Sequence, residues 1–532
     1  MDSSTSHLPE NLIVAHQMIV ELLQALQEKD RDCERLRHQL ERLKQRLYGR
    51  KSEKISDEQF LFEYAGLLAE AEEAVSEEPE PVPPESEPEC VSKPRKRNGK
   101  VRCQTAGDLR VERIEYPLEE DRCVCEKCGE RLERFGEEVT RQVDYIPASF
   151  YIREQVRFKY GCPCCRETVV VSDLPSQPIE KGLPGPGLLA YLLTSKYADH
   201  LPLYRLEQIV SRQGVTISRK TMCDWVRACA KLLEPLYGRM KQEALESKVL
   251  HTDDTPVPVQ NKNREGMRQG RLWVYVGDGD HPQVLYDYTP TRCREGPLKF
   301  LKDYRGYLQA DAYAGYDELY RRGEVVEVGC WAHARRKYWE SRKSDRKRAH
   351  TALAYVGRLY KVEREAKAHE EENKLSGKER AVYRCAARQE KSRPILEEFQ
   401  TWLQEQENQV LPKSPLGEAI GYTLRQWDAL TRYTNDGDLS IDNNPAEQQM
   451  RPVALGRKNW LFAGSDDGGW RAAIIYSLIQ TCKRHGVDPF AYLRDVLARI
   501  ADHPMNRIQE LAPLAWKQLQ QQVHSLPETA KV

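Results

Sequence analysis

The sequence predicts a multidomain α+β protein, and three observations support this prediction. Its 532 residues exceed the size of one ordinary domain, so three or more folding units are expected. An apolar heptad occupies the N-terminal region, residues 12–47. Further along, residues 248–330 alternate between short β-rich runs and helical patterns.

The charge of the chain is balanced overall but segregated along the sequence. Lysines and arginines total 82, as do aspartates and glutamates, which gives a formal net charge of zero. Residues 57–90 hold twelve acidic and no basic residues, so the remainder carries an excess of twelve positive charges. An acidic segment of this kind can cancel the positive charge of a basic DNA-binding region when only the net charge of the whole chain is counted. Since we find neither an apolar run of membrane length nor a signal-peptide core, we expect a soluble cytoplasmic protein, nucleoid-associated and without a membrane partner.

The heptad predicts a coiled-coil helix over residues 8–55. Its two apolar positions alternate at spacings of three and four, with charges between them. One position holds Leu12, Ile19, Leu26, Cys33, Leu40 and Leu47, and the other holds Ala15, Leu22, Lys29, Leu36 and Leu43. The alternative is a lone amphipathic helix packed on its own chain, but a seam of about five heptads favours self-association. Residues 56–104 are acidic and proline-rich, which predicts a disordered linker.

Two Cys-x-x-Cys pairs predict a zinc-binding β module over residues 105–175. Cys125 and Cys128 form one pair, and Cys162 and Cys165 form the other after 33 intervening residues. Two such knuckles deliver four thiolates to one tetrahedral Zn²⁺, and the zinc is expected to be structural. The alternative is a set of reduced cysteines without metal. Two further thiols, Cys123 and Cys164, leave the choice of ligands open.

Helix-turn-helix spacing follows in a helical segment over residues 186–246. An amphipathic helix from Leu203 is expected to end at Gly214, and Ser218 can cap a second helix running through Trp225. The N-terminal end of that second helix would contact DNA through Arg219, Lys220 and Thr221. The alternative is an ordinary helical bundle, in which the same geometry is common.

The alternating region predicts a ribonuclease-H-like core, because three strands are followed by helix, strand, helix and strand. The expected strands cover 248–259, 271–277, 283–288, 306–313 and 325–330, and the expected helices cover 296–304 and 315–322. This catalytic core would comprise residues 247–338 and 411–465, interrupted by a charged helical insertion over 339–410. A C-terminal helical element, residues 466–520, would pack on it through an amphipathic run from Trp470 to Ile500.

Three acidic residues occupy positions where this fold carries catalytic metal ligands. Asp253 falls on the first strand, Asp311 at the end of the fourth, and Glu447 on a later helix. Attack on a phosphodiester requires an activated nucleophile and a stabilised leaving oxygen, and carboxylates holding two Mg²⁺ or Mn²⁺ ions meet both needs. Each acid also has a structural alternative, and that of Glu447 is a capping box with Asn444 as N-cap and Pro445 as the first helical residue.

The chain resembles the transposases of the insertion-sequence-66 family, which are bacterial DDE enzymes, over nearly its whole length. The matching segments are Leu47 to Lys54, the two-knuckle module, His251 to Val257, Gln309 to Tyr313, Gly329 to Lys337, Asp442 to Glu447 and Arg451 to Gly464. The resemblance implies that Asp253, Asp311 and Glu447 form the catalytic triad. It also implies small accessory proteins encoded by the same element. A homo-oligomer is expected because two ends must be cut in concert, and the N-terminal heptad is one candidate for holding it together.

Further residues are candidates for supporting roles. The family usually has glutamate where this chain has Asp254, which either supports catalysis or orients Thr255. His333, in a Cys-x-x-His element, either touches the scissile phosphate or orders a helix beside the active site. Phosphate contacts are expected from Arg451, Arg457 and Lys458.

Together these observations predict a transposase that binds terminal inverted repeats and target DNA, cleaves 3′ ends and transfers strands. The alternatives are a non-catalytic DNA-binding protein derived from a transposase, and a ribonuclease-H-like nuclease.

Overall fold

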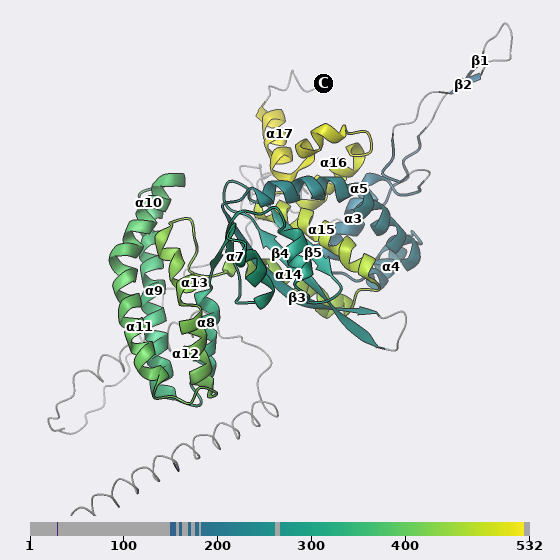
Figure 1. Cartoon of the computed structure of the whole chain (residues 1–532). Helices are drawn as coiled ribbons and strands as arrows, with labels where there is room; N and C mark the ends of the chain where they lie inside the picture. Colours follow the sequence, from purple (N-terminus) through teal and green to yellow (C-terminus); the bar gives the residue numbers. More distant parts are fainter. Residues whose placement is uncertain are drawn as a thin grey trace, which may run out of the picture. The chain divides into compact units, whose positions relative to one another are not determined.

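The computed structural model describes residue 29 and residues 149–155, 159–161, 169–171, 176–179, 182–260 and 266–525. The chain divides into two compact units, residues 1–75 with 150–532 and residues 76–149. All the helices and strands labelled in Figure 1 belong to the first unit. Apart from Lys29, the predicted coiled coil and linker lie outside the described residues. So do all four predicted zinc ligands. Two short strands, β1 (Lys159–Gly161) and β2 (Val169–Val171), pair antiparallel on either side of Cys162 and Cys165.

A five-stranded mixed sheet forms the centre of the unit, with the strand order β5-β4-β3-β6-β7. Its strands are β3 (Val249–Gln260), β4 (Met267–Val276), β5 (Val284–Thr289), β6 (Gly306–Gln309) and β7 (Val325–Val328). The first three pair antiparallel, whereas β6 runs parallel to both β3 and β7. The connections hold α6 (Glu295–Phe300), η2 (Ala314–Tyr316) and α7 (Asp317–Arg321). The predicted order of strands and helices in this region is therefore confirmed.

Strand β6 is shorter than the predicted strand, which was expected to continue to Tyr313. The chain turns after Gln309, and the backbone N–H of Tyr313 donates to the carbonyl of Asp311 at 2.8 Å. Asp311 therefore lies just beyond the sheet, in the turn that leaves the carboxyl end of β6.

Three helices precede the sheet: α3 (Pro186–Tyr197), α4 (Leu203–Arg212) and α5 (Arg219–Leu245). Ser218 caps α5 as predicted, since its Oγ accepts a hydrogen bond from the backbone N–H of Thr221 at 3.2 Å. The prediction that this helix ends at Trp225 is wrong. The helix continues to Leu245 because its apolar face extends well past Trp225, with Leu233, Leu236 and Met240 all buried.

Helix α15 (Asp466–Arg484) packs against strand β5 and helices α3 and α5. The expected amphipathic pattern is wrong here, because all ten residues from Ala473 to Cys482 are buried between these neighbours. Two hydroxyls face the edge strand: Ser477 Oγ accepts from the Tyr286 N–H at 2.8 Å, and Thr481 Oγ1 accepts from the Val284 N–H at 3.0 Å. The helix thereby satisfies backbone donors at the sheet edge. Helices α16 (Pro489–Arg499) and α17 (Pro513–Ser525), with η5 (Met505–Leu511) between them, complete this end of the chain.

The segment after β7 is helical. It contains α8 (Trp331–Ser341), α9 (Arg346–Glu372), α10 (Gly377–Ala387), a π-helical turn η3 (Arg388–Ser392), α11 (Arg393–Glu407), α12 (Pro415–Arg425), α13 (Trp427–Thr431) and η4 (Arg432–Asn435). Aromatic residues centred on Phe399 and Trp331 fill its apolar core, which extends onto Val249 and Val328 of the sheet. Helix α14 (Asn444–Trp460) then returns to β3. Every helix within the described ranges is too short or too polar to traverse a lipid bilayer.

Candidate active site

The parallel pairing of β3 and β6 brings two of the predicted acids to one level of the sheet. His251 pairs with Gln309 in this register. Asp253 and Asp311 each lie two residues beyond that pair, Asp253 within β3 and Asp311 in the turn just after β6. The edge where a parallel strand ends is a common place for functional side chains, and Asp253 lies level with that edge on the neighbouring strand.

Helix α14 carries Glu447 and is tied to β3 by Asn443, the residue before its first turn. The fully buried Asn443 donates from Nδ2 to the carbonyl of Thr252 at 2.8 Å. Its Oδ1 lies 3.2 Å from His251 Nδ1, and burial lowers the pKa of His251 to about 4. His251 is therefore neutral. Because Asn443 Oδ1 can only accept a hydrogen bond, His251 Nδ1 carries the hydrogen and donates it. Both ends of the Asn443 amide are satisfied, which fixes the start of α14 beside Asp253.

The capping-box alternative for Glu447 is wrong. The N-cap of α14 is Asn443, which makes no side-chain capping bond, and Asn444 donates instead to Asp442 Oδ2 at 2.7 Å. Asn443 cannot cap the helix because its side chain is engaged with β3. Glu447 Oε1 is buried and has no hydrogen-bond partner among the described residues.

The three acids influence one another electrostatically. Burial raises the pKa of Asp253 to about 7, and the charges of Asp311 and Glu447 add to this increase, while a hydrogen bond from the Asp254 N–H opposes it. Burial also raises the pKa of Asp311, against the opposing influence of His333 and Arg292. The site therefore holds more negative charge than its surroundings stabilise. A bound cation would offset the repulsion between these carboxylates.

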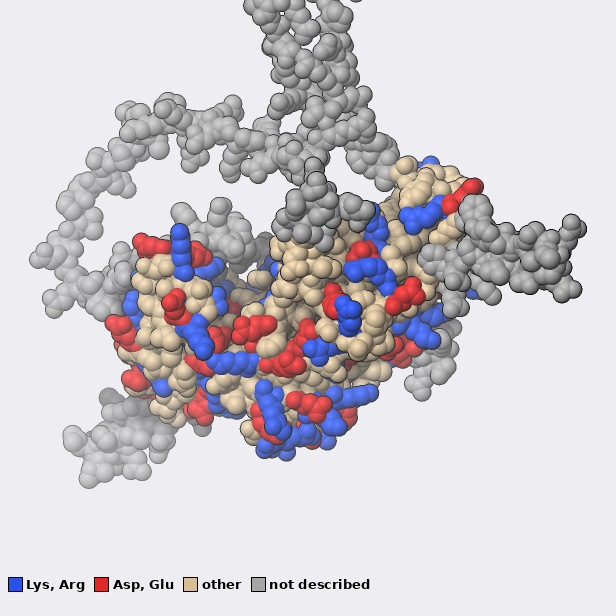
Figure 2. Space-filling model, turned by 90° about the horizontal axis from the view of Figure 1, so that it is seen from above, with Lys and Arg blue, Asp and Glu red and all other residues tan. Residues whose placement is uncertain are grey.

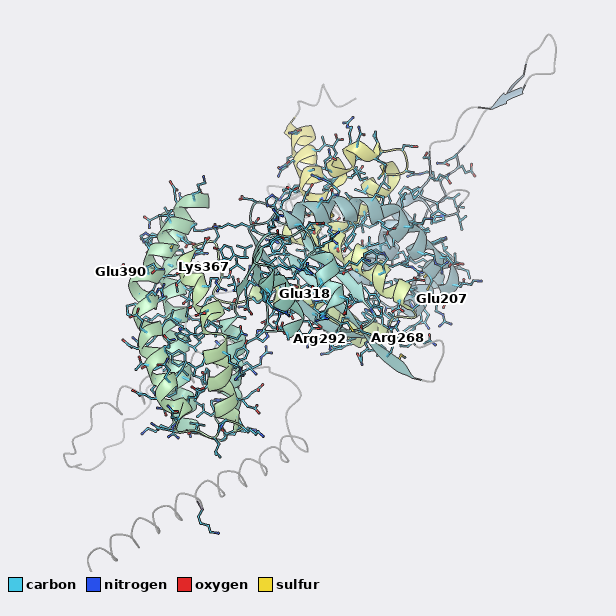
Figure 3. All side chains as sticks on the ribbon, viewed as in Figure 1. Glu207, Arg268, Arg292, Glu318, Lys367 and Glu390 are labelled. Atoms are coloured by element: carbon cyan, nitrogen blue, oxygen red, sulfur yellow. The ribbon has the colours of Figure 1, made fainter. Side chains whose placement is uncertain are left out.

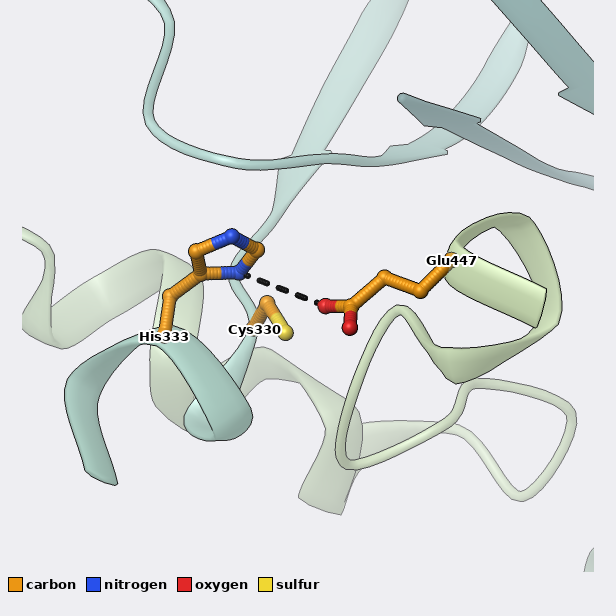
Figure 4. Close-up of side chains that lie close together, drawn as sticks. All are labelled: Cys330, His333 and Glu447. Atoms are coloured by element: carbon orange, nitrogen blue, oxygen red, sulfur yellow. Dashed lines mark ion pairs between the residues drawn. The ribbon is translucent and has the colours of Figure 1, made fainter. Parts of the chain in front are cut away.

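His333 and Cys330 adjoin Glu447 (Figure 4). His333 Nδ1 lies 3.8 Å from Glu447 Oε1 and, like it, lacks a hydrogen-bond partner among the described residues. Cys330 is fully buried at the start of α8, where its Sγ accepts from the Asn443 N–H at 3.2 Å. His333 therefore lies close to Asp311 and Glu447.

Asp254, a candidate for catalytic support, is engaged by two arginines that the sequence analysis did not identify. Its side chain is only 3% exposed. It accepts from Arg271 Nη1 at 2.9 Å and from Arg292 Nε and Nη2 at 3.0 and 2.8 Å. Arg292, which Figure 3 labels, also reaches Asp311 Oδ2 at 3.5 Å and lies over the ring of Tyr313. No short motif marks Arg292; its only sequence signal is a basic residue in the loop after the third strand.

The residues predicted to contact DNA near α5 lie at the beginning of that helix. Arg219 pairs with Glu207 of α4, which Figure 3 labels, with 3.1 Å between Nε and Oε2. Lys220 is exposed. Thr221 contributes to the N-terminal cap of α5. Arg219 and Lys220 are therefore both exposed at this end of α5.

On α14, the three predicted phosphate contacts differ. Arg451 and Lys458 are exposed. Arg457 instead turns toward β3, where it donates to Thr255 Oγ1 at 3.2 Å and to the carbonyl of Pro256. On the face shown in Figure 2, basic and acidic side chains are interspersed.

Four family models match the chain. "Transposase IS66 family" covers residues 181–471, and "IS66 C-terminal element" covers 477–514. The "zinc-finger binding domain of transposase IS66" covers 122–166, which includes all four predicted zinc ligands. "Transposase C of IS166 homeodomain" covers 35–114.

Three curated proteins of Sinorhizobium fredii (strain NBRC 101917 / NGR234) are similar over most of their length. Uncharacterized protein y4hP is 35% identical over 433 residues, which is 78% of this chain and 77% of the relative. Uncharacterized protein y4jD is 31% identical, covering 76% of this chain and 80% of the relative. Uncharacterized protein y4qI is 34% identical, covering 76% of each. These matches confirm the expected resemblance, and the chain belongs to the IS66 family of transposases.

Proposed function

We propose that the chain is a metal-dependent DNA transposase that cleaves the 3′ ends of its element and joins them to target DNA. The five-stranded sheet with order β5-β4-β3-β6-β7 supports a ribonuclease-H-like assignment of its core. In that assignment Asp253, Asp311 and Glu447 are the catalytic carboxylates.

One observation carries the proposal. The charges of Asp311 and Glu447 both raise the pKa of Asp253, although the three residues come from strand β3, the turn after β6 and the distant helix α14. Packing does not require three partly buried carboxylates to converge, and their mutual repulsion is unfavourable unless a ligand compensates it. Helix α14 is held against β3 by a buried amide, so the convergence is built into the fold.

Divalent cations fit this arrangement. Carboxylate oxygens are the ligands that Mg²⁺ and Mn²⁺ prefer, and Glu447 Oε1 is buried without a partner among the described residues. Asp253, Asp311 and Glu447 would hold two such ions. When bound, the ions activate the attacking oxygen and stabilise the charge on the leaving oxygen. A separate structural Zn²⁺ would be held by Cys125, Cys128, Cys162 and Cys165.

The chain's own residues position the reacting groups. Asn443 fixes Glu447 relative to Asp253, because it binds β3 directly before α14 begins. Arg292 lies beside Asp311 with its guanidinium oriented by Asp254. His333 lies beside Glu447 and is suited to contact a phosphate oxygen.

Double-stranded DNA, as element ends and target, is the proposed partner. Arg219, Lys220 and Thr221 would meet it at the N-terminus of α5. The exposed Arg451 and Lys458 would contact phosphates beside the active site, whereas Arg457 would have to leave its bonds to β3 to do so. We propose that the protein acts as a homo-oligomer, because two ends must be cut together, and that it acts with accessory proteins of the same element.

A strand-transfer assay tests the proposal, with full-length protein, Mg²⁺ and labelled DNA carrying the element's own ends. Wild-type protein should cut and join, and Asp311→Asn should do neither while still binding the DNA. Cutting without joining would instead indicate a nuclease. Binding without cutting by wild-type protein would indicate a non-catalytic DNA-binding protein.

A further inference from the structure

Cys330, His333 and Glu447 bring a sulfur, a nitrogen and an oxygen together at one point. These ligand atoms all lie within 4.8 Å of one another (Figure 4). Cys330 is the N-cap of α8, and His333 follows in the first turn of the same helix. Glu447 approaches from the first turns of α14. The cluster thus joins two helices that begin next to each other.

The spacing suits four-coordinate zinc. Bonds of about 2.0 to 2.3 Å place the ligands of a tetrahedral ion roughly 3.5 Å apart. His333 Nδ1 and Glu447 Oε1 are 3.8 Å apart, so a movement of a few tenths of an ångström would allow both atoms to bond the same zinc ion. Cysteine and histidine select zinc-like cations, whereas Mg²⁺ takes oxygen ligands. The cluster therefore differs in chemistry from the all-carboxylate set.

The surroundings of the three atoms also favour an ion. His333 Nδ1 and Glu447 Oε1 are buried, and neither has a hydrogen-bond partner among the described residues. The backbone N–H of Asn443 donates to Cys330 Sγ at 3.2 Å, as backbone amides do to metal-bound thiolates. The N-terminus of the eleven-residue α8 adds a positive partial charge next to the sulfur. Burial has the opposite influence, because it raises the pKa of the free thiol to about 12, and an ion that binds Cys330 must therefore displace the thiol proton to solvent.

We propose that Cys330, His333 and Glu447 form a site for a thiophilic divalent cation of the Zn²⁺ class. Occupation of this site draws Glu447 into a different coordination sphere from that of Asp253 and Asp311. Zinc bound here therefore inhibits DNA cleavage driven by Mg²⁺. This second consequence rests on the proposed function, whereas binding of the ion does not.

Binding is tested first, on full-length protein dialysed until elemental analysis finds no more zinc in wild type than in Cys330→Ser, so that the Cys330 site is free. The probe is Co²⁺, whose bond to a thiolate gives a near-ultraviolet charge-transfer band. Wild-type protein should gain this band with one added equivalent of Co²⁺, and Cys330→Ser should not. The matched control is Cys223→Ser, an exposed thiol on α5, which should behave like wild type. Equal band intensity in wild type and Cys330→Ser would overturn the proposal.

A second variant guards against misfolding of Cys330→Ser, since Cys330 is fully buried. The His333 side chain is 23% exposed, so His333→Gln is expected to fold. It should weaken uptake of Co²⁺ and of Zn²⁺ by at least about tenfold, as expected for loss of one ligand. Unchanged uptake by His333→Gln contradicts the site.

Inhibition is measured as the Zn²⁺ concentration that halves cleavage, with each variant normalised to its own rate in Mg²⁺ alone. Cys330→Ser should need at least about ten times more Zn²⁺ than wild type or Cys223→Ser. If Co²⁺ binding depends on Cys330 but the protein does not cleave DNA, the proposed function is wrong and the metal site is still supported. Cleavage with equal zinc sensitivity in all three proteins would remove the inhibitory role.

Discussion

Asn443 donates a hydrogen bond to the backbone carbonyl of Thr252 across 191 positions of sequence, with 2.8 Å between Nδ2 and the oxygen. This bond joins the start of α14 to the strand that carries Asp253. The other end of the same amide accepts from His251. The position of Glu447 relative to Asp253 therefore depends on one fully buried side chain.

Asn443→Ala should disturb the active site more than the fold. It leaves the Thr252 carbonyl and the His251 N–H buried without partners, which should cost about 1 to 3 kcal/mol of stability. Strand transfer should fall about a hundredfold, because displacement of a catalytic group by about 1 Å has that effect. Urea unfolding and the strand-transfer assay measure the two effects. Asn459→Ala, on the same helix, is the matched control, and wild-type transfer by Asn443→Ala would refute the positioning role.

Neutralising a catalytic carboxylate should separate activity from stability. Asp253→Asn, Asp311→Asn and Glu447→Gln should each lower strand transfer by at least about a thousandfold, since metal coordination supplies several kcal/mol to the transition state. In protein stripped of divalent cations, Asp253→Asn should melt at a higher temperature than wild type. The reason is that the Asp253 carboxylate is buried beside Asp311 and Glu447, which raises its pKa. Glu318→Gln, at a partly exposed position on α7, removes only the ion pair with Arg322, so it should leave strand transfer unchanged and should change the melting temperature little. An active Asp253→Asn would contradict the assignment.

Much of this arrangement was predictable because it depends on local pattern. Alternating β-rich runs and short helical patterns predicted the order of elements in the sheet, with Asp253 on the first strand and Asp311 at the end of the fourth. The shape of β6 was less predictable, since the chain leaves the sheet at Gln309 through a turn that the sequence pattern does not distinguish from strand.

The features that sequence could not supply are tertiary. The local motif after Asp442 is typical of a capping box, but Asn443 is engaged with Thr252 and His251, and the cap is not formed. Arg292 belongs to no motif, and only folding brings it to Asp254. Similarly, α15 is covered on several sides, so its buried stretch has no single apolar face.

Asp287 on β5 should give stability an unusual dependence on pH. Burial raises its pKa from 3.8 to about 6, although nearby Lys241 opposes the shift. The folded state therefore favours the protonated acid. Its contribution to stability is complete below pH 4 and is lost as the pH rises through 6. Asp287→Asn should thus stabilise the protein by on the order of 2 kcal/mol at pH 7.5 and much less at pH 4.5.

Thermal melting at the two pH values measures this difference for Asp287→Asn. The matched control is Asp280→Asn, in the exposed turn after β4, which should change the melting temperature little at either pH. If Asp287→Asn raised the melting temperature as much at pH 4.5 as at pH 7.5, burial of the ionised carboxylate could not be the cause of the stabilisation.

The cysteine module should hold one zinc ion per chain. Strands β1 and β2 pair on either side of Cys162 and Cys165, and the zinc-finger family model covers residues 122–166. Elemental analysis is best done in a Cys330→Ser background, which excludes the second site. Serine at Cys125, Cys128, Cys162 or Cys165 should abolish bound zinc, whereas serine at Cys123 or Cys164 should not. Zinc retained by Cys125→Ser and lost from Cys123→Ser would change the ligand assignment.

The buried ion pair between Arg388 and Glu363 should be the most sensitive point of the helical segment between β7 and α14. Arg388 is fully buried in the π-helical turn η3. It donates from Nε and Nη2 to Glu363, at 2.8 Å each, and from Nη1 to the carbonyls of Tyr433 and Asp436. Arg388→Met removes all four of these hydrogen bonds and leaves the Glu363 carboxylate without its partner. Breaking a buried pair in this way should cost about 3 to 5 kcal/mol.

Exposure provides the control for this prediction. Arg358 pairs with Glu398 at the same distance of 2.8 Å, but both side chains are substantially exposed, at 44% and 53%. Arg358→Met should therefore cost less than about 1 kcal/mol, since water and salt screen exposed pairs. Far-ultraviolet circular dichroism during urea unfolding compares the two variants. Adding Glu363→Gln to Arg388→Met should recover part of the loss, because the unpaired carboxylate is then neutral. Equal losses for Arg358→Met and Arg388→Met would mean that burial does not determine the strength of these pairs.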